Sequence, residues 1–240
     1  MSRDRGVTWA KSPRIHHTGG SSHLAVGPNG EVAVRITPLS VAGSRYHAGV
    51  DLIAVSTDGG ATWQKRPAPG HRDWPFKAGQ PGKIPRWVEP IAWDAQGALY
   101  SLWTDSTGVW LARSTDRGIT WKQWRISETG DLAHFPYLIA RGRGELAATW
   151  FTGSRETLQW HAAWINVGDG ETYPRVMESV ALRTDSWEPP DQPGEPAVRD
   201  TAGEYLGITF LRDGGFAVVS PIQDMLSWRF GFSWWRFETH

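Results

Sequence analysis

Apolar stretches of about 4 to 10 residues run along this chain, separated by turns rich in Gly, Asp and Pro. Such spacing predicts short β-strands joined by hairpins. The stretches fall into four groups of three, and the expected strands are 23–27, 31–36 and 50–56; 89–93, 98–103 and 109–114; 135–140, 145–151 and 158–167; and 205–211, 216–220 and 230–237. The last stretch is bulky at most positions, so we expect it to be buried on both faces. The pattern therefore predicts an all-β fold.

An eight-residue pattern, Ser-x-Asp-x-Gly-x-Thr-Trp, follows the third stretch in the first two groups and also opens the chain. It occupies residues 2–9, 56–63 and 114–121, and an eroded copy at 166–173 has Gly168 where the Asp would stand. The third positions are 4, 58, 116 and 168, so the spacings are 54, 58 and 52 residues. A period of this length fits one four-stranded blade of a β-propeller and is too long for one turn of a solenoid.

Each position of the repeat has a physical role in a hairpin turn. The Asp carboxylate accepts hydrogen bonds from the backbone of its own turn, and the Gly takes a conformation that a Cβ would oppose. The Trp leaves the turn and is expected to pack between neighbouring sheets. The structural residues expected from the repeat are Asp4, Asp58 and Asp116 together with Trp9, Trp63 and Trp121.

These motifs resemble the Asp boxes, or BNR repeats, of sialidases and related propeller proteins. In that family the box joins the third and fourth strands of a blade, on the face away from the active site. The resemblance implies a single domain over 1–240, a β-propeller of four-stranded antiparallel blades. Because the last group supplies only three strands and the chain opens on a box, two arrangements stay open. Either the two ends complete one blade of a four-bladed ring, or the chain is a fragment of a longer propeller, such as a six-bladed sialidase, truncated at its N-terminus.

Composition narrows the classes of partner. Twenty-five Lys and Arg balance 25 Asp and Glu, which argues against nucleic acid and against a polybasic membrane patch, and no apolar run approaches the ~20 residues of a membrane helix. The chain has no Cys, so disulfides and thiolate metal sites are excluded, and we expect no metal and no cofactor. We expect a monomer that binds carbohydrate. No signal peptide is visible after residues 1–5, whereas the resembled family is often secreted or periplasmic, so localisation stays open.

The face opposite the boxes is where the expected topology gathers polar residues. The innermost strands begin there, and their first positions carry titratable side chains, which makes a site at the mouth of the axis a reasonable expectation. The same residues could instead hydrogen-bond adjacent loops. The candidate catalytic residues are Glu89, His134, Asp105 and Glu204. The candidate substrate-binding residues, which include rings for stacking on sugars and arginines for gripping a carboxylate, are Arg35, His23, Tyr46, Arg86, Trp87 and Arg155.

Two functions follow from the repeat and these candidates. The first is a sialidase-like, carbohydrate-active propeller: a glycoside hydrolase or a fragment of one. A sialidase needs an arginine clamp, a Tyr and Glu nucleophile pair and an Asp acid/base. The family's Arg-Ile-Pro signature is absent, residues 83–86 (KIPR) are a weak echo of it, and no Tyr and Glu match the catalytic pair. The second function is therefore a non-catalytic propeller that binds a glycan or a protein on the same face.

Overall fold

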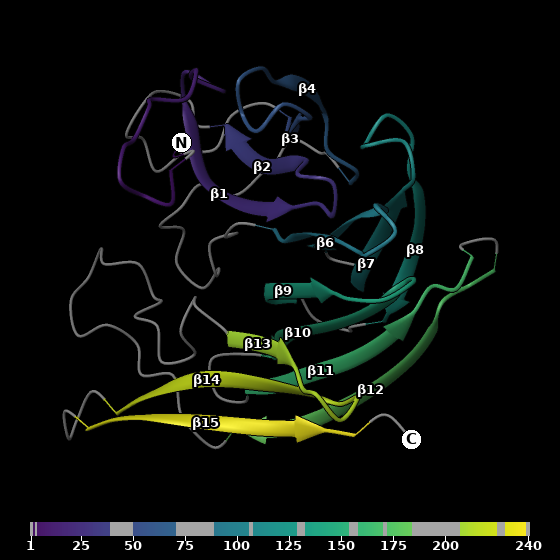
Figure 1. The fold of residues 1–240 in the computed structure, drawn as a ribbon. Helices are drawn as coiled ribbons and strands as arrows, with labels where there is room; N and C mark the ends of the chain where they lie inside the picture. The colour runs from purple at the N-terminus through teal and green to yellow at the C-terminus, as the bar shows by residue number, and fades with distance from the viewer. Residues whose placement is uncertain are drawn as a thin grey trace.

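The computed structural model describes residues 2, 4–38, 50–70, 89–105, 108–128, 133–153, 158–169, 172–183, 207–224 and 229–238. Within these ranges the fold is all β, with strands arranged in four antiparallel sheets (Figure 1). In every sheet the strands follow one another in chain order, so each neighbouring pair is a hairpin or a simple return. The expected all-β, propeller-type architecture is confirmed.

The strands agree with the predicted stretches to within a few residues. The first blade contains β1 (Gly19–Val26), β2 (Val32–Pro38), β3 (Leu52–Ser56) and β4 (Gln64–Pro67). The second blade contains β5 (Ile91–Trp93), β6 (Leu99–Asp105), β7 (Gly108–Ser114) and β8 (Lys122–Ser127). The third blade contains β9 (His134–Ala140), β10 (Glu145–Gly153), β11 (Leu158–Asn166) and β12 (Arg175–Arg183). The fourth sheet contains β13 (Gly207–Phe210), β14 (Phe216–Asp224) and β15 (Arg229–Phe237).

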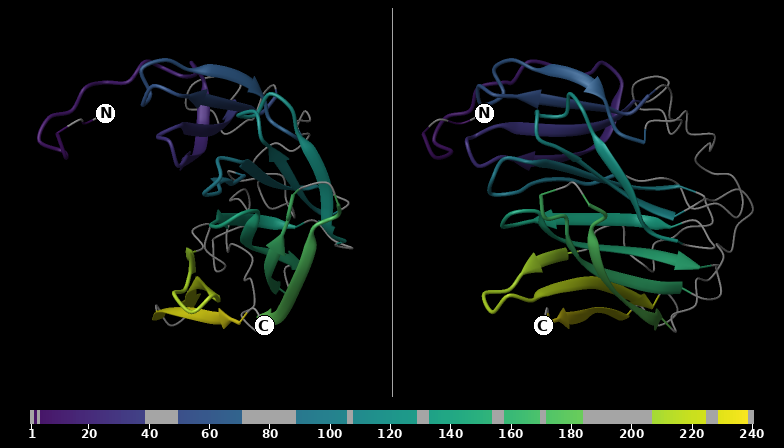
Figure 2. Two further views of the ribbon diagram at one scale, coloured as in Figure 1. Left: turned by 45° about the vertical axis from the view of Figure 1, so that its right-hand side comes forward. Right: turned by 90° about the vertical axis from the view of Figure 1, so that its right-hand side faces the viewer.

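The sheets are arranged radially as the blades of a propeller. The first strands of successive sheets, β1, β5, β9 and β13, contact one another in order and form the inner side of the arc (Figure 2). Figure 2 shows the four sheets along an open arc, with the first blade at one end and the fourth sheet at the other. Among the described residues β15 has β14 as its only neighbouring strand. The N-terminal box lies beyond the first blade, so the two ends do not complete one blade in this structure (Figure 2).

Apolar side chains fill the space between each pair of neighbouring sheets, because successive residues of a strand point to opposite faces. In the third blade, Leu146 and Trp150 pack against the second blade, whereas Ala147 and Phe151 pack with Phe216 of the fourth sheet. These side chains are fully buried. A blade buried on both faces explains why strands of this chain are apolar at nearly every position rather than at every second one.

The Asp boxes form the hairpin turns that the sequence predicts. In the first blade, Thr62 donates its backbone N–H to Asp58 Oδ1 at 2.9 Å and its hydroxyl to Asp58 Oδ2 at 2.6 Å. Ser56 Oγ accepts the backbone N–H of Gly60 at 2.8 Å, and Gly60 has a φ of +88°. The Thr62 hydroxyl bond, followed by the backbone bond, lowers the pKa of Asp58 from 3.8 to about 2. Both oxygens of the Asp58 carboxylate therefore accept hydrogen bonds within its own turn, as expected of a structural residue.

The boxes at 2–9 and 114–121 repeat this geometry. Thr8 and Thr120 donate their backbone N–H groups to Asp4 and Asp116 at 2.8 and 2.9 Å. The Thr8 hydroxyl bond lowers the pKa of Asp4 to about 2. At Asp116 burial opposes the shift, but the Thr120 bonds outweigh it and the pKa is again about 2.

The expectation that all three box tryptophans are buried is only partly correct. Trp63 and Trp121 are half-buried and pack against the clusters on the two faces of the first blade. Trp9 is 75% exposed, because no sheet of the described chain lies against the N-terminal box. The last strand is also not buried on both faces, since Trp234 on β15 is 65% exposed. Both errors have one cause, which is that these residues lie at the open ends of the arc.

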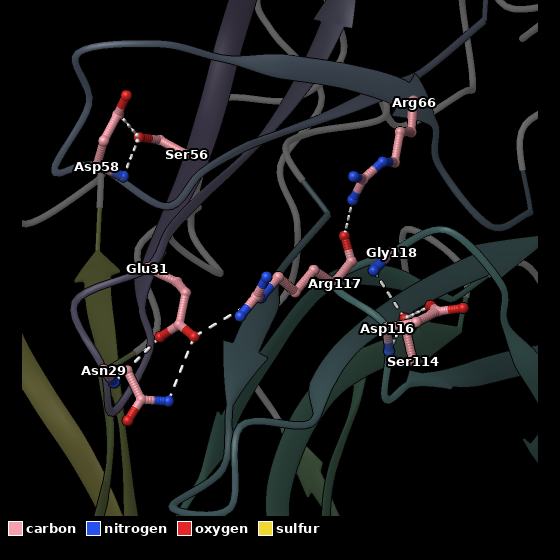
Figure 3. A network of polar contacts seen from close by, with 9 residues as sticks. All are labelled: Asn29, Glu31, Ser56, Asp58, Arg66, Ser114, Asp116, Arg117 and Gly118. Carbon is pink, nitrogen blue, oxygen red and sulfur yellow. Dashed lines mark hydrogen bonds and ion pairs between the residues drawn. The ribbon is translucent and has the colours of Figure 1, made fainter.

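Polar contacts at the box face connect one blade to the next (Figure 3). The guanidinium of Arg66 on β4 donates to the backbone carbonyl of Arg117 in the second blade's box. The Arg117 side chain forms an ion pair with Glu31 of the first blade, with 3.8 Å between Arg117 Nε and Glu31 Oε1. Figure 3 shows these residues between the two boxes. The box ends of the first and second blades are therefore joined by structural contacts.

Candidate polar site at the axial mouth

A buried polar cluster lies at the end of the first blade opposite to its box. The cluster contains Arg35 on β2, Asp51 directly before β3, and Glu89 two residues before the start of β5. Strand β2 runs away from the box face and β3 returns to it, while β5 is entered from the outer strand of the preceding blade. The three side chains therefore meet where the first and second blades approach the axis.

Arg35 is the centre of this cluster. Its Nη2 donates to Asp51 Oδ2 at 3.1 Å and also to Glu89 Oε2, and its Nη1 donates to Ser101 Oγ on β6 at 2.6 Å. The side chains of Arg35, Asp51 and Glu89 are 0%, 4% and 2% exposed. A buried guanidinium needs such partners, because an unpaired charge in this position would be strongly destabilising. The cluster thus joins the first blade to the second through charge.

His23 lies beside this cluster on the innermost strand β1. Its Cα is the register partner of Arg35 on β2, so the two side chains share a face of the sheet. The His23 Nδ1 atom accepts the backbone N–H of Ile91 on β5 at 3.5 Å. Its ring meets Tyr137 of β9 edge-on, with 6.4 Å between centroids. Burial lowers the pKa of His23 below its usual 6.5, which favours the neutral imidazole.

Three blades therefore contribute to one region near the axis. β1 supplies His23, β5 supplies the backbone of Ile91 after Glu89, and β9 supplies Tyr137. The structure thus brings together three residues that the sequence singled out, namely His23, Arg35 and Glu89. It adds Asp51 and Ser101, which sequence reasoning missed. Asp51 stands one residue before a strand, and the sequence carries no local signal that its carboxylate faces an arginine 16 positions away.

The other candidates are placed as follows. Asp105 ends β6, beyond Ser101 on the same strand, and is half-buried. The backbone of His134 begins β9 and pairs with Phe151. The candidates outside the described residues are Glu204, Tyr46, Arg86, Trp87 and Arg155. For all of these the assigned roles stay predictions.

A second polar chain lies within the third blade. His161 Nδ1 contacts Glu178 Oε1 at 2.6 Å, His161 Nε2 contacts Thr152 Oγ1 at 2.6 Å, and the ring stacks on Trp150 at 5.4 Å. Thr152 and His161 are buried among the apolar side chains of that face. Both ring nitrogens are satisfied, so this imidazole is packed and hydrogen-bonded as part of the core.

The described part of the chain contains no group of three or more His, Cys, Asp or Glu side chains arranged to hold a metal ion. Nor do the described ranges include a helix with the length and apolar character that crossing a membrane requires.

Comparison with models of known protein families identifies two of the repeats. Residues 54–65 and 112–123 match the family described as BNR/Asp-box repeat. The chain carries BNR/Asp-box repeats. The two matched segments are the boxes of the first and second blades, where the Ser, Asp, Gly and Thr contacts are formed. No curated protein sequence matches this chain significantly.

Solved structures with a similar arrangement include three glycan-degrading enzymes. They are a xylan beta-1,4-xylosidase from Bacillus halodurans (11% identity, TM-score 0.44), an endo-arabinase from Bacteroides thetaiotaomicron (9%, 0.48) and an alpha-L-arabinanase from Penicillium chrysogenum complexed with arabinobiose (16%, 0.39). The alignments cover 94%, 90% and 94% of this chain. The chain spans 42%, 74% and 64% of those three chains.

Proposed function

We propose that this Asp-box propeller is carbohydrate-active and binds a glycan at the axial mouth. In this proposal the Asp51 and Glu89 carboxylates catalyse hydrolysis of a glycosidic bond. The observation that carries the proposal is that both carboxylates contact the same nitrogen, Nη2 of Arg35. Each carboxylate oxygen is within hydrogen-bond reach of that atom, so the two oxygens lie no more than about 6 Å apart.

This separation fits a known chemical requirement. Retaining glycosidases use two carboxyl groups about 5–5.5 Å apart, one as nucleophile and one as acid and then base, whereas inverting enzymes need about 6.5–9.5 Å to admit a water. An upper limit of about 6 Å lies below the range of the inverting enzymes and is compatible with the retaining class. In this proposal Arg35 is a positioning residue, because it fixes both carboxylates relative to each other without contacting the sugar.

The test is the release of reducing ends from a panel of polysaccharides and oligosaccharides. We expect turnover by the wild-type chain and a loss of about a hundredfold or more in Glu89→Gln and in Asp51→Asn. Asp213→Asn is the matched control, since Asp213 is an exposed carboxylate that also pairs with an arginine, Arg236. A folded Glu89→Gln variant with the wild-type rate would remove Glu89 from the mechanism. Absence of both turnover and binding across the panel would reject the proposal.

A second candidate is a propeller that binds a glycan at the same mouth without cleaving it. The near-complete burial of all three charged side chains favours it, because a reacting carboxylate must reach the sugar. The same panel separates the two functions. Binding by calorimetry with no release of reducing ends supports the non-catalytic function, whereas release that depends on Glu89 supports hydrolysis.

A further inference from the structure

We infer that His23 is a pH-sensitive contact between blades at the axial mouth: the neutral imidazole holds the start of β5 against β1, and protonation of the ring releases it. This inference concerns the response of the fold to acid and does not depend on the proposed function. It assigns a role to a residue that the proposed hydrolysis does not use.

His23 lies where the first three blades meet. The residue belongs to β1, its Nδ1 accepts the backbone N–H of Ile91 on β5 at 3.5 Å, and its ring meets Tyr137 of β9 edge-on. Ile91 follows Glu89 by two residues, and the Glu89 carboxylate accepts a hydrogen bond from Arg35 of the first blade. The start of β5 is therefore attached to the first blade twice, once through Glu89 and once through His23.

Only the neutral imidazole can form the bond with Ile91. In the neutral ring Nδ1 can present a lone pair, whereas protonation places a hydrogen on both ring nitrogens. The Nδ1–H group of a protonated His23 would face the Ile91 N–H group, donor against donor, so the contact would become repulsive. At 3.5 Å the bond is at the long end of hydrogen-bond distances, so a small rotation of the ring is enough to break it.

The surroundings keep the ring neutral at neutral pH, because burial lowers the pKa of His23 below its usual 6.5. The charged and titratable groups around it in the described chain are Arg35, which shares its face of the first blade, the Asp51 and Glu89 carboxylates that contact Arg35, and the Tyr137 hydroxyl group of β9. The carboxylates favour a protonated imidazole and the guanidinium opposes it. The pKa is lowered nevertheless, so burial decides the sign.

A lowered pKa fixes the direction of the response. The released ring is solvated and has the ordinary pKa of about 6.5, so protons bind more tightly to the released arrangement than to the attached one. The attached arrangement is therefore fully favoured above about pH 6.5, and this preference is lost as the pH falls through the pKa of the folded state. Each unit between the two pKa values corresponds to a tenfold shift of the equilibrium toward release.

The experiment combines two titrations of the wild-type chain across neutral and mildly acid pH. Nuclear magnetic resonance of the imidazole protons gives the pKa of His23, whose signal is identified by its loss in His23→Asn. Hydrogen exchange gives the protection factor of the Ile91 amide, which is its exchange rate relative to that of an unfolded chain at the same pH. The amide of Leu111, a fully buried residue of the second blade, is the internal control.

We expect the protection of Ile91 to fall from about pH 6.5 down to the measured pKa of His23 and to level off below it. The loss should be about tenfold for each unit by which that pKa lies below 6.5, while Leu111 keeps its protection. Protection of Ile91 that stays constant would overturn the inference. So would a pKa of His23 at or above 6.5, or a loss of protection that Leu111 shares.

His23→Asn separates the contact from its titration. The Asn Oδ1 atom can accept the Ile91 N–H in place of Nδ1 and does not ionise, so the protection of Ile91 should no longer depend on pH. His17→Asn, which changes an exposed imidazole before β1, is the matched control and should keep the wild-type dependence. Near-ultraviolet circular dichroism establishes that each variant is folded. A folded His23→Asn chain whose Ile91 protection falls in acid as in the wild type would refute the assignment.

Discussion

Removal of the Arg35 guanidinium is expected to have a large effect on stability. Arg35→Met keeps the length of the aliphatic stem but leaves Asp51 and Glu89 buried without their shared cation. Their side chains are only 4% and 2% exposed, so water cannot take over the role of the guanidinium. Breaking a buried ion pair by removing one partner costs about 3–5 kcal/mol, against a total stability of about 5–15 kcal/mol for a typical protein.

The matched control is Arg236→Met. Arg236 pairs with Asp213, but these side chains are 45% and 51% exposed, and exposed pairs contribute about 0–1 kcal/mol. The assay is urea unfolding followed by tryptophan fluorescence, with the free energy of unfolding obtained by linear extrapolation. A third variant, Arg35→Met with Asp51→Leu and Glu89→Met, should recover most of the loss, because an apolar replacement of a whole buried cluster is often neutral. Equal losses in Arg35→Met and Arg236→Met would refute the reasoning.

Three further predictions concern the boxes and the core. Gly118→Ala should destabilise by about 1–2 kcal/mol, because φ is +83° and the new Cβ would lie 3.2 Å from Trp121; chemical denaturation measures this, and a neutral result would contradict it. Asp58→Asn should lower the melting temperature at pH 7. Because the folded pKa of Asp58 is depressed from 3.8 to about 2, the difference from wild type should be constant above about pH 4 and disappear as the pH falls to 2; a pH-independent difference would contradict this. Trp150→Ala should cost about 3–5 kcal/mol in the same denaturation assay, since the ring is fully buried between blades, and a loss below 1 kcal/mol would exclude that packing.

Most of the fold was predictable because its signals are local. A strand such as β10 and a turn such as the box at 56–63 are specified by residues within about ten positions of one another. The period of the boxes then predicts the length of one blade, since a box marks the turn between the third and fourth strands. Exposure was predicted less well. Trp9 and Trp63 occupy the same place in the same motif, yet burial depends on whether a neighbouring sheet is present, and no motif encodes that.

The site was predictable only in part, for the same physical reason. The sequence indicates Arg35 and Glu89 as separate candidates, because each is a charged residue close to the end of an apolar strand. Their contact joins positions 54 apart, and Ser101 is 66 positions from the arginine it binds. Such pairings are set by how two blades pack, so a single sequence cannot assign partners. The sequence singled out Arg35 as a substrate-binding residue, and the structure adds its contacts with Asp51 and Glu89. Its role toward a ligand stays a prediction.

The measurement that tests the central claim most directly is amide hydrogen exchange of the wild-type chain, with and without the glycan that binds most tightly in calorimetry. The account predicts that bound sugar slows exchange in the segments that hold the charged cluster, 31–38, 50–56 and 89–93. Protection confined to the box turns at 56–63 and 114–121, or absent from the axial segments, would contradict it.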